Sequence, residues 1–227
     1  FHRFVSYENV HVIGAYVEIK PVNCDVKATV VSGINAQVTN NGAQHLTEVS
    51  KRAFDEKYLQ MGMVTTESEV AIAVSTVHDV FLDGEKTEET AYKIVDDRRK
   101  IHAKIQLDIP NGETARVEKI STVHSSRDLE YTGSGKEPDK ETVYANGLEN
   151  LKEAECKGYR TLLQESREVW EAIWKKQDIV IDSREDDAQV AVRFALYHLQ
   201  IMVRKEDNRV GIGAKALSGE GYKGHSF

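Results

Sequence analysis

The period of the apolar residues changes once along this chain, and this change constrains its fold more than any other feature. Up to residue 128, apolar and polar residues alternate, most clearly in residues 26–30, 70–76 and 101–107. A period of two buries one face of a strand and leaves the other in water, as in antiparallel sheets. From Tyr144 onward, apolar residues recur at helical spacing instead. The sequence therefore predicts a mainly β chain with helices in its second part.

Turn signals separate the alternating runs. Asn40-Asn41-Gly42, Asp83-Gly84 and Asn111-Gly112 stand between them, and Asn-Gly between two alternating runs is a strong hairpin signal. Many short strands with no helical period between them predict an antiparallel β-sandwich over residues 1–132. The charged segment 83–100 fits either a long solvated hairpin or a short helix, and the sequence leaves both open.

Glycine and proline in residues 133–138 end the β region, and a helical linker is predicted over residues 133–182. Gly158 is expected to divide this linker into two helices. Trp170 and Trp174 lie four residues apart, so they share one face of the second helix. We interpret them as anchors that pack this helix against a neighbour, because large aromatic side chains dominate buried contacts. A sugar-stacking platform is the alternative.

Another helical pattern begins near Asp186. Asp182 and Ser183 offer N-cap oxygens before it, and acidic residues fill its first turn. Its apolar residues fall on most of its faces, so it needs cover from other helices. We expect residues 183–227 to be the beginning of a helical domain. The helix itself is expected to pack on the helix of Trp170 and Trp174 or on a second copy of the chain.

Composition excludes several classes of function. The formal net charge is −7 and the pI is near 5.7, which disfavours a nucleic-acid partner because such binding needs a basic face. No apolar run reaches the roughly 20 residues that span a bilayer, so no membrane partner is expected. Cys24 and Cys156 lie far apart without metal-ligand spacing and are interpreted as free thiols in the cytoplasm.

Isolated polar residues in the β region carry weak signals of function. His78, His102 and His124 fall on predicted strands and are interpreted as surface or hydrogen-bonded core imidazoles. Ser126-Arg127-Asp128 is interpreted as an ion pair that holds a strand end rather than as a charged site.

The segment 211–227 is dense in glycine and carries Lys215, Glu220, Tyr222 and His225. Glycines let the backbone approach a ligand closely, and aromatic, acidic and imidazole groups orient polar ligands. The segment therefore predicts the edge of a polar substrate pocket. Lys215 is interpreted as an ordinary surface lysine.

The stretch from Ala214 to Phe227 resembles the AKGLxGEGYxGHxFWDTE segment of glycoside hydrolase family 65, which comprises maltose, trehalose and kojibiose phosphorylases and related hydrolases. Earlier stretches agree with this family in order: residues 3–6, 21–23, 32–35, 44–46, 118–119 and 126–128. The resemblance covers essentially the whole chain. It implies a fragment: an amino-terminally truncated β-sandwich, linker helices and the first helix of a truncated (α/α)6 catalytic barrel.

The resemblance also implies an activity and a site. The parent would be an inverting α-glucobiose phosphorylase, with inorganic phosphate as co-substrate and no cofactor or metal, and family members are often homodimers. Its general acid is expected downstream of Phe227, so Glu220 is interpreted as a loop-organising residue. Four residues are expected to form the near edge of the glucose subsite: Tyr222, Gly224, His225 and Phe227. A hydrolase of the same family and a non-catalytic carbohydrate-binding sandwich remain the alternatives.

Overall fold

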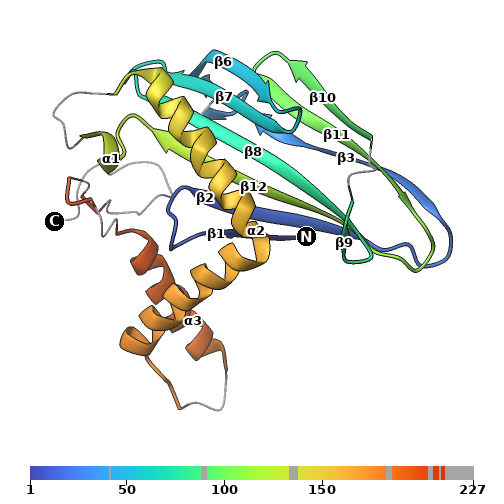
Figure 1. The fold of residues 1–227 in the computed structure, drawn as a ribbon. Helices are drawn as coiled ribbons and strands as arrows, with labels where there is room; N and C mark the ends of the chain where they lie inside the picture. Colours follow the sequence, from blue (N-terminus) through green and yellow to red (C-terminus); the bar gives the residue numbers. More distant parts are fainter. Residues whose placement is uncertain are drawn as a thin grey trace. The chain divides into compact units, whose positions relative to one another are not determined.

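Two antiparallel sheets form most of residues 1–125 in the computed structural model, which describes residues 1–40, 42–87, 91–132, 138–182, 186–203, 207–209 and 211–212. Figure 1 shows the large sheet, whose strand order is β1-β2-β12-β8-β7-β6 with β9 paired to β8. In that order its strands are β1 (His2–Val5), β2 (Val12–Ile19), β12 (Ala115–Ser125), β8 (Ala71–Leu82), β7 (Tyr58–Thr65), β6 (Leu46–Phe54) and β9 (Glu85–Lys86).

The small sheet has the order β10-β11-β3 and covers one face of the large sheet. Its strands are β10 (Ala91–Asp97), β11 (Lys100–Ile109) and β3 (Val26–Asn35), and a separate two-stranded ribbon pairs β4 (Thr39–Asn40) with β5 (Ala43–Gln44). The described part of segment 83–100 therefore contributes strands and a hairpin, which decides between the two alternatives. Residues 91–97 are held in the small sheet because β10 pairs with β11 along its whole length.

The core between the sheets explains the period of two. On β11, buried Ile101, Ala103, Ile105 and Leu107 alternate with less buried residues, and they pack against Leu59 and other residues of the large sheet. Each strand of the small sheet thus faces the core on one side only. The predicted antiparallel β-sandwich followed by helices is confirmed.

Helix α2 (Lys140–Gln177) covers the other face of the large sheet. Leu151, Ala154 and Leu162 of α2 form a second core with Val77 of β8 and Ile120 of β12. The large sheet is therefore buried on both faces, and β7 is buried without alternation from Tyr58 to Met63. Short α1 (Leu129–Thr132) precedes α2 in the chain.

Gly158 breaks the helical conformation inside α2, as the sequence predicts. Its φ is +78° and its ψ is +159°, values that glycine adopts without the steric cost paid by other residues. Figure 1 shows the bend in α2 that results.

The chain divides into two compact units, Phe1–Val169 and Trp170–Phe227. In the second unit, α3 (Asp186–Ile201) packs against the end of α2, with the rings of Trp170 and Tyr197 5.1 Å apart. The expected packing of this helix on the tryptophan helix is confirmed. Apolar side chains on α3 stay largely exposed, among them Val190, Phe194 and Leu199.

Candidate functional site

The residues that were predicted to line a sugar subsite are Tyr222, Gly224, His225 and Phe227, and all four lie outside the described residues. Glu220 and Lys215 lie outside them as well. These assignments stay predictions.

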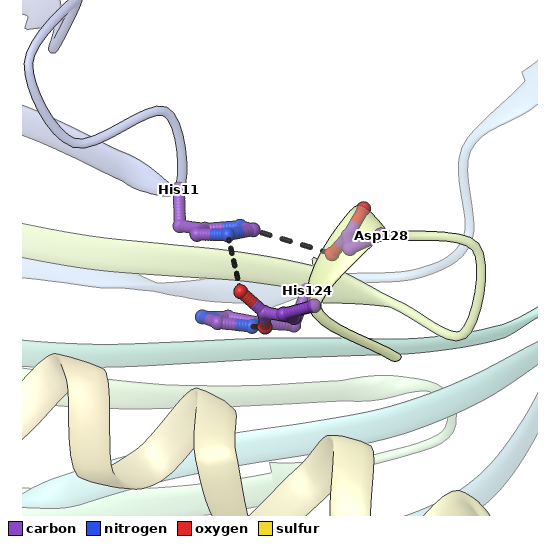
Figure 2. A group of neighbouring side chains, drawn as sticks. His11, His124 and Asp128 are labelled. Carbon is purple, nitrogen blue, oxygen red and sulfur yellow. Dashed lines mark hydrogen bonds and ion pairs between the residues drawn. The ribbon is translucent and has the colours of Figure 1, made fainter. Parts of the chain in front are cut away.

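A cluster of titratable side chains gathers instead at one end of the large sheet. Its members are His11, His124, Asp128 and Glu130, whose candidate ligand atoms lie within 4.8 Å of one another. His11 stands in the loop between β1 and β2, His124 on β12, Asp128 in the turn after β12 and Glu130 in α1. Figure 2 shows the His11 ring stacked on the His124 ring, with Asp128 beside His11.

Backbone pairing places the two imidazoles on each other. The amide of Val123 donates to the carbonyl of His11 over 3.0 Å, and the His11 Nδ1 lies 2.8 Å from the carbonyl oxygen of Val123. Because a carbonyl only accepts, Nδ1 carries the proton of that bond. The rings of His11 and His124 are then 3.8 Å apart and nearly parallel, at 11°.

The two carboxylates have different roles. Asp128 closes the turn after β12, since it accepts from the Ser125 amide at 2.7 Å and from the Ser125 hydroxyl at 2.8 Å. The strand end is thus held by Asp128, but through Ser125 rather than through the expected pair with Arg127. Glu130 contacts both imidazoles, at 3.5 Å from His11 Nε2 and 3.1 Å from His124 Nδ1.

Burial sets the charge of His124. Its side chain is nearly inaccessible, and burial together with the neighbouring His11 lowers the pKa of His124, although Glu130 opposes this shift. His124 Nε2 is buried, and Asn150 is among the neighbours that act on the ring. Stacking of a neutral imidazole next to a second one avoids like-charge repulsion.

The side chains as they lie do not fit a single metal ion. Zn²⁺ bound to imidazole lies about 2.0–2.1 Å from the nitrogen, in the plane of the ring. Two nearly parallel rings stacked 3.8 Å apart have no point that satisfies both conditions. In addition, Ser125 already engages both oxygens of Asp128. The cluster therefore connects the β1–β2 loop, the end of β12 and α1 through hydrogen bonds and ion pairs.

His78 was interpreted as a surface or core imidazole, and the structure places it inside the sandwich. Its ring nitrogens lie 2.9 Å from the Ser32 hydroxyl and 3.3 Å from the Tyr92 hydroxyl. Lys119, its cross-strand neighbour, donates to the Gly33 carbonyl at 2.7 Å. Burial, with Lys119 nearby, lowers the pKa of His78 to about 3. The pair links the two sheets.

The structure also shows the positions of His102, the two tryptophans and the two cysteines that were considered from the sequence. His102 is half-buried on β11, in register with Gly33. Trp170 and Trp174 are stacked on each other with ring centroids 6.3 Å apart, and the contact of Trp170 with Tyr197 supports the packing interpretation. Cys24 and Cys156 are free thiols, as predicted.

Sequence comparison assigns the chain to a family. The N-terminal domain of glycosyl hydrolase family 65 matches residues 1–173, and the central catalytic domain of that family matches residues 193–227. The chain belongs to glycosyl hydrolase family 65. The resemblance stated from the sequence is thereby confirmed.

Similar proteins of this family include several phosphorylases. The chain is 36% identical over its whole length to a kojibiose phosphorylase of Halothermothrix orenii, 32% identical over 99% of its length to one of Escherichia coli, and 25% identical over 99% to an alpha,alpha-trehalose phosphorylase of Thermoanaerobacter brockii. It spans 28–29% of the length of these relatives.

A solved structure shares the fold. It is a candidate kojibiose phosphorylase from the human microbiome, with a TM-score of 0.82 and 16% sequence identity over 99% of this chain and 28% of that one. No helix among the described residues is long and apolar enough to cross a membrane.

Two members of the cluster, His11 and Glu130, were not singled out from the sequence. His11 stands two residues beyond Asn9 in a loop, and nothing local marks it as a partner of His124. The contact between His11 and His124 follows from the register in which β2 pairs with β12. That register can be inferred only once the order of strands in the sheet is known.

Proposed function

We propose that the whole protein containing this chain is a disaccharide phosphorylase of family 65. It would cleave an α-linked glucobiose with inorganic phosphate and release β-glucose 1-phosphate and an acceptor sugar. The observation that supports this most directly is the 36% identity, over the entire chain, to the kojibiose phosphorylase of Halothermothrix orenii.

Inversion sets the course of the proposed reaction. A phosphate oxygen bonds to the anomeric carbon from the face opposite the leaving group, while the glycosidic C–O bond breaks. A protonated carboxyl group gives its proton to the departing oxygen. Phosphate takes the place that water has in a hydrolase, so no second carboxylate is needed as a base. We place the general acid downstream of Phe227 and the near edge of the glucose subsite at Tyr222, Gly224, His225 and Phe227.

Among α-glucobioses we favour kojibiose. The relatives of Halothermothrix orenii and Escherichia coli, 36% and 32% identical, are both kojibiose phosphorylases, whereas the trehalose phosphorylase of Thermoanaerobacter brockii is 25% identical. The test supplies the whole protein with kojibiose, trehalose, nigerose and maltose, each with and without phosphate, and follows glucose 1-phosphate and glucose. Phosphate-dependent glucose 1-phosphate from kojibiose is expected. Glucose release that ignores phosphate would assign the protein to the hydrolases of the family.

The 227-residue chain alone should be inactive. Transition-state stabilisation needs the acid, the sugar clamp and the phosphate pocket in fixed positions, and we place the acid beyond this chain. Glu220→Gln in the same chain is the control. Turnover by the chain that Glu220→Gln abolishes would contradict this placement and make Glu220 the acid.

We further propose that the whole protein is a cytoplasmic homodimer. Light scattering at increasing concentration tests the assembly. A mass equal to one chain at every concentration would refute the dimer.

A further inference from the structure

A cavity of about 480 Å³ lies within the first unit, where the end of the large sheet meets the bend of α2. Its walls come from β2, β8, β12, the turn between β8 and β9, and residues 157–160 of α2. Cavities of a few hundred Å³ are the size that holds small organic ligands. The cavity is separate from the His11 cluster and contains none of its residues.

An ion pair packed against aromatic rings forms part of the cavity wall. The guanidinium of Arg116 pairs with the carboxylate of Glu118 and lies 4.1 Å from the centre of the Tyr16 ring. Tyr159, only 3% exposed, packs its ring against Tyr16 at 5.2 Å. Burial raises the pKa of Glu118, while Arg116 opposes that shift. This part of the wall is thus preorganised by aromatic packing and a charge-assisted pair.

The rim, by contrast, carries groups with unused hydrogen-bonding capacity. Asp83 and Arg160 are exposed, and neither forms an ion pair with another residue of the described ranges. Gly84 and Gly158 have open space where a Cβ would stand, at φ values of +90° and +78°. An acceptor and a donor therefore line the rim, and each is next in the chain to or near a glycine that leaves space beside it.

The balance of positive and negative charges around the cavity determines which class of ligand it favours. Three carboxylates and three cationic groups line the cavity: Glu18, Asp83, Glu118, Arg116, Lys157 and Arg160. An anion would meet the carboxylates and a cation the guanidinium groups, so neither gains from the net field. A neutral polyhydroxylated ligand gains from both, since each hydroxyl donates to a carboxylate and accepts from a guanidinium. Phe81 adds an aromatic side chain to the wall.

We propose that this cavity is a carbohydrate-binding site for neutral mono- or disaccharides. Asp83 accepts from sugar hydroxyls, Arg160 donates to them, and Phe81 contacts the apolar face of the ring. The site holds its sugar without bond cleavage, so its occupancy does not depend on phosphate. This inference stands independently of which disaccharide the whole protein cleaves.

The test is an amide-resolved NMR titration of the 227-residue chain with kojibiose, trehalose and maltose. Saturable shifts are expected at the backbone amides of Phe81, Asp83, Gly84 and Gly158, with half-saturation on the order of 1–10 mM. Asp83→Asn and Arg160→Gln each remove one charged partner from an exposed position. Each should weaken binding by about 10-fold, the loss expected for a hydrogen bond to a charged group.

Matched controls separate the site from general effects. Glu67→Gln and Lys20→Gln remove charges at exposed positions outside the cavity, and they should leave the half-saturation concentration unchanged. Inorganic phosphate, added alone, should not move the same amides. Shifts that persist in the Asp83→Asn, Arg160→Gln double variant would overturn the proposal. So would the absence of sugar-induced shifts at these amides, or shifts produced by phosphate and not by sugar.

Discussion

His78 should make the stability of the sandwich depend on pH in a calculable way. Its side chain is 7% exposed, and burial with the nearby Lys119 lowers its pKa from 6.5 to about 3. Between these two values the unfolded chain binds a proton at residue 78 and the folded chain does not. Stability contributed by neutral His78 is therefore complete above pH 6.5 and falls as the pH drops toward 3.

The magnitude follows from proton linkage. Each pH unit across which only the unfolded state is protonated costs 1.36 kcal/mol. Integrating from pH 7 to pH 5 with an unfolded pKa of 6.5 gives a loss of about 2 kcal/mol from this residue. Urea unfolding curves at the two pH values measure the total loss. Other titrating groups, including His124 and Glu118, contribute to that total as well.

A substitution isolates the contribution of residue 78. His78→Gln cannot titrate, and its amide still reaches toward Ser32, so all other titrating groups cancel in the comparison. The parent chain should lose about 2 kcal/mol more than His78→Gln between pH 7 and pH 5. His2→Gln, at an exposed strand position, should behave like the parent. Equal losses for the parent and His78→Gln would refute the neutral buried state of His78.

Three further changes test the packing and the cluster. Gly62→Ala should cost about 1–3 kcal/mol of unfolding free energy, because its Cβ would stand 2.5 Å from the Tyr144 ring; an unchanged urea midpoint would contradict this contact. Leu151→Ala should cost about 2–5 kcal/mol, because Leu151 is fully buried between α2 and the large sheet; a loss below this range would show that the helix is not firmly seated. Adding Zn²⁺ should leave the melting temperature unchanged, since the stacked rings of His11 and His124 share no metal position; a rise that His124→Gln removes would show that the rings reorient and bind the ion.

The sequence predicts the small sheet better than the large one. Alternation in residues 101–107 follows from one-sided burial of β11, which a period of two reports directly. On β7 the side chains of Leu59, Gln60 and Met61 are all buried, because the small sheet and α2 cover opposite faces. Two-sided burial removes the alternation, so periodicity alone does not reveal where the layers meet.

The break in α2 was predictable, and the residues gathered around His124 were not. Gly158 stands out in a helical pattern because of its own conformational freedom, which is a local property. The contact of His11 with His124 joins residues that are 113 positions apart in the sequence, and it depends on the pairing of β2 with β12. Asp128 does hold the strand end, but it does so through Ser125 and not through the predicted pair with Arg127, because a turn carboxylate accepts from the nearest donors.

The two faces of the large sheet make the sandwich and the first part of α2 one cooperative structure. Val77 and Ile120 meet Leu151 of α2 on one face, while the opposite face packs on the small sheet. The Thr122 hydroxyl also donates to the Gly147 carbonyl at 2.7 Å, which ties α2 to β12 by a buried bond. The compact unit ends at Val169, close to residue 173, where the match to the N-terminal domain of the family ends. Because separating α2 would expose one whole core layer to water, this helix belongs energetically to the β-domain that it covers.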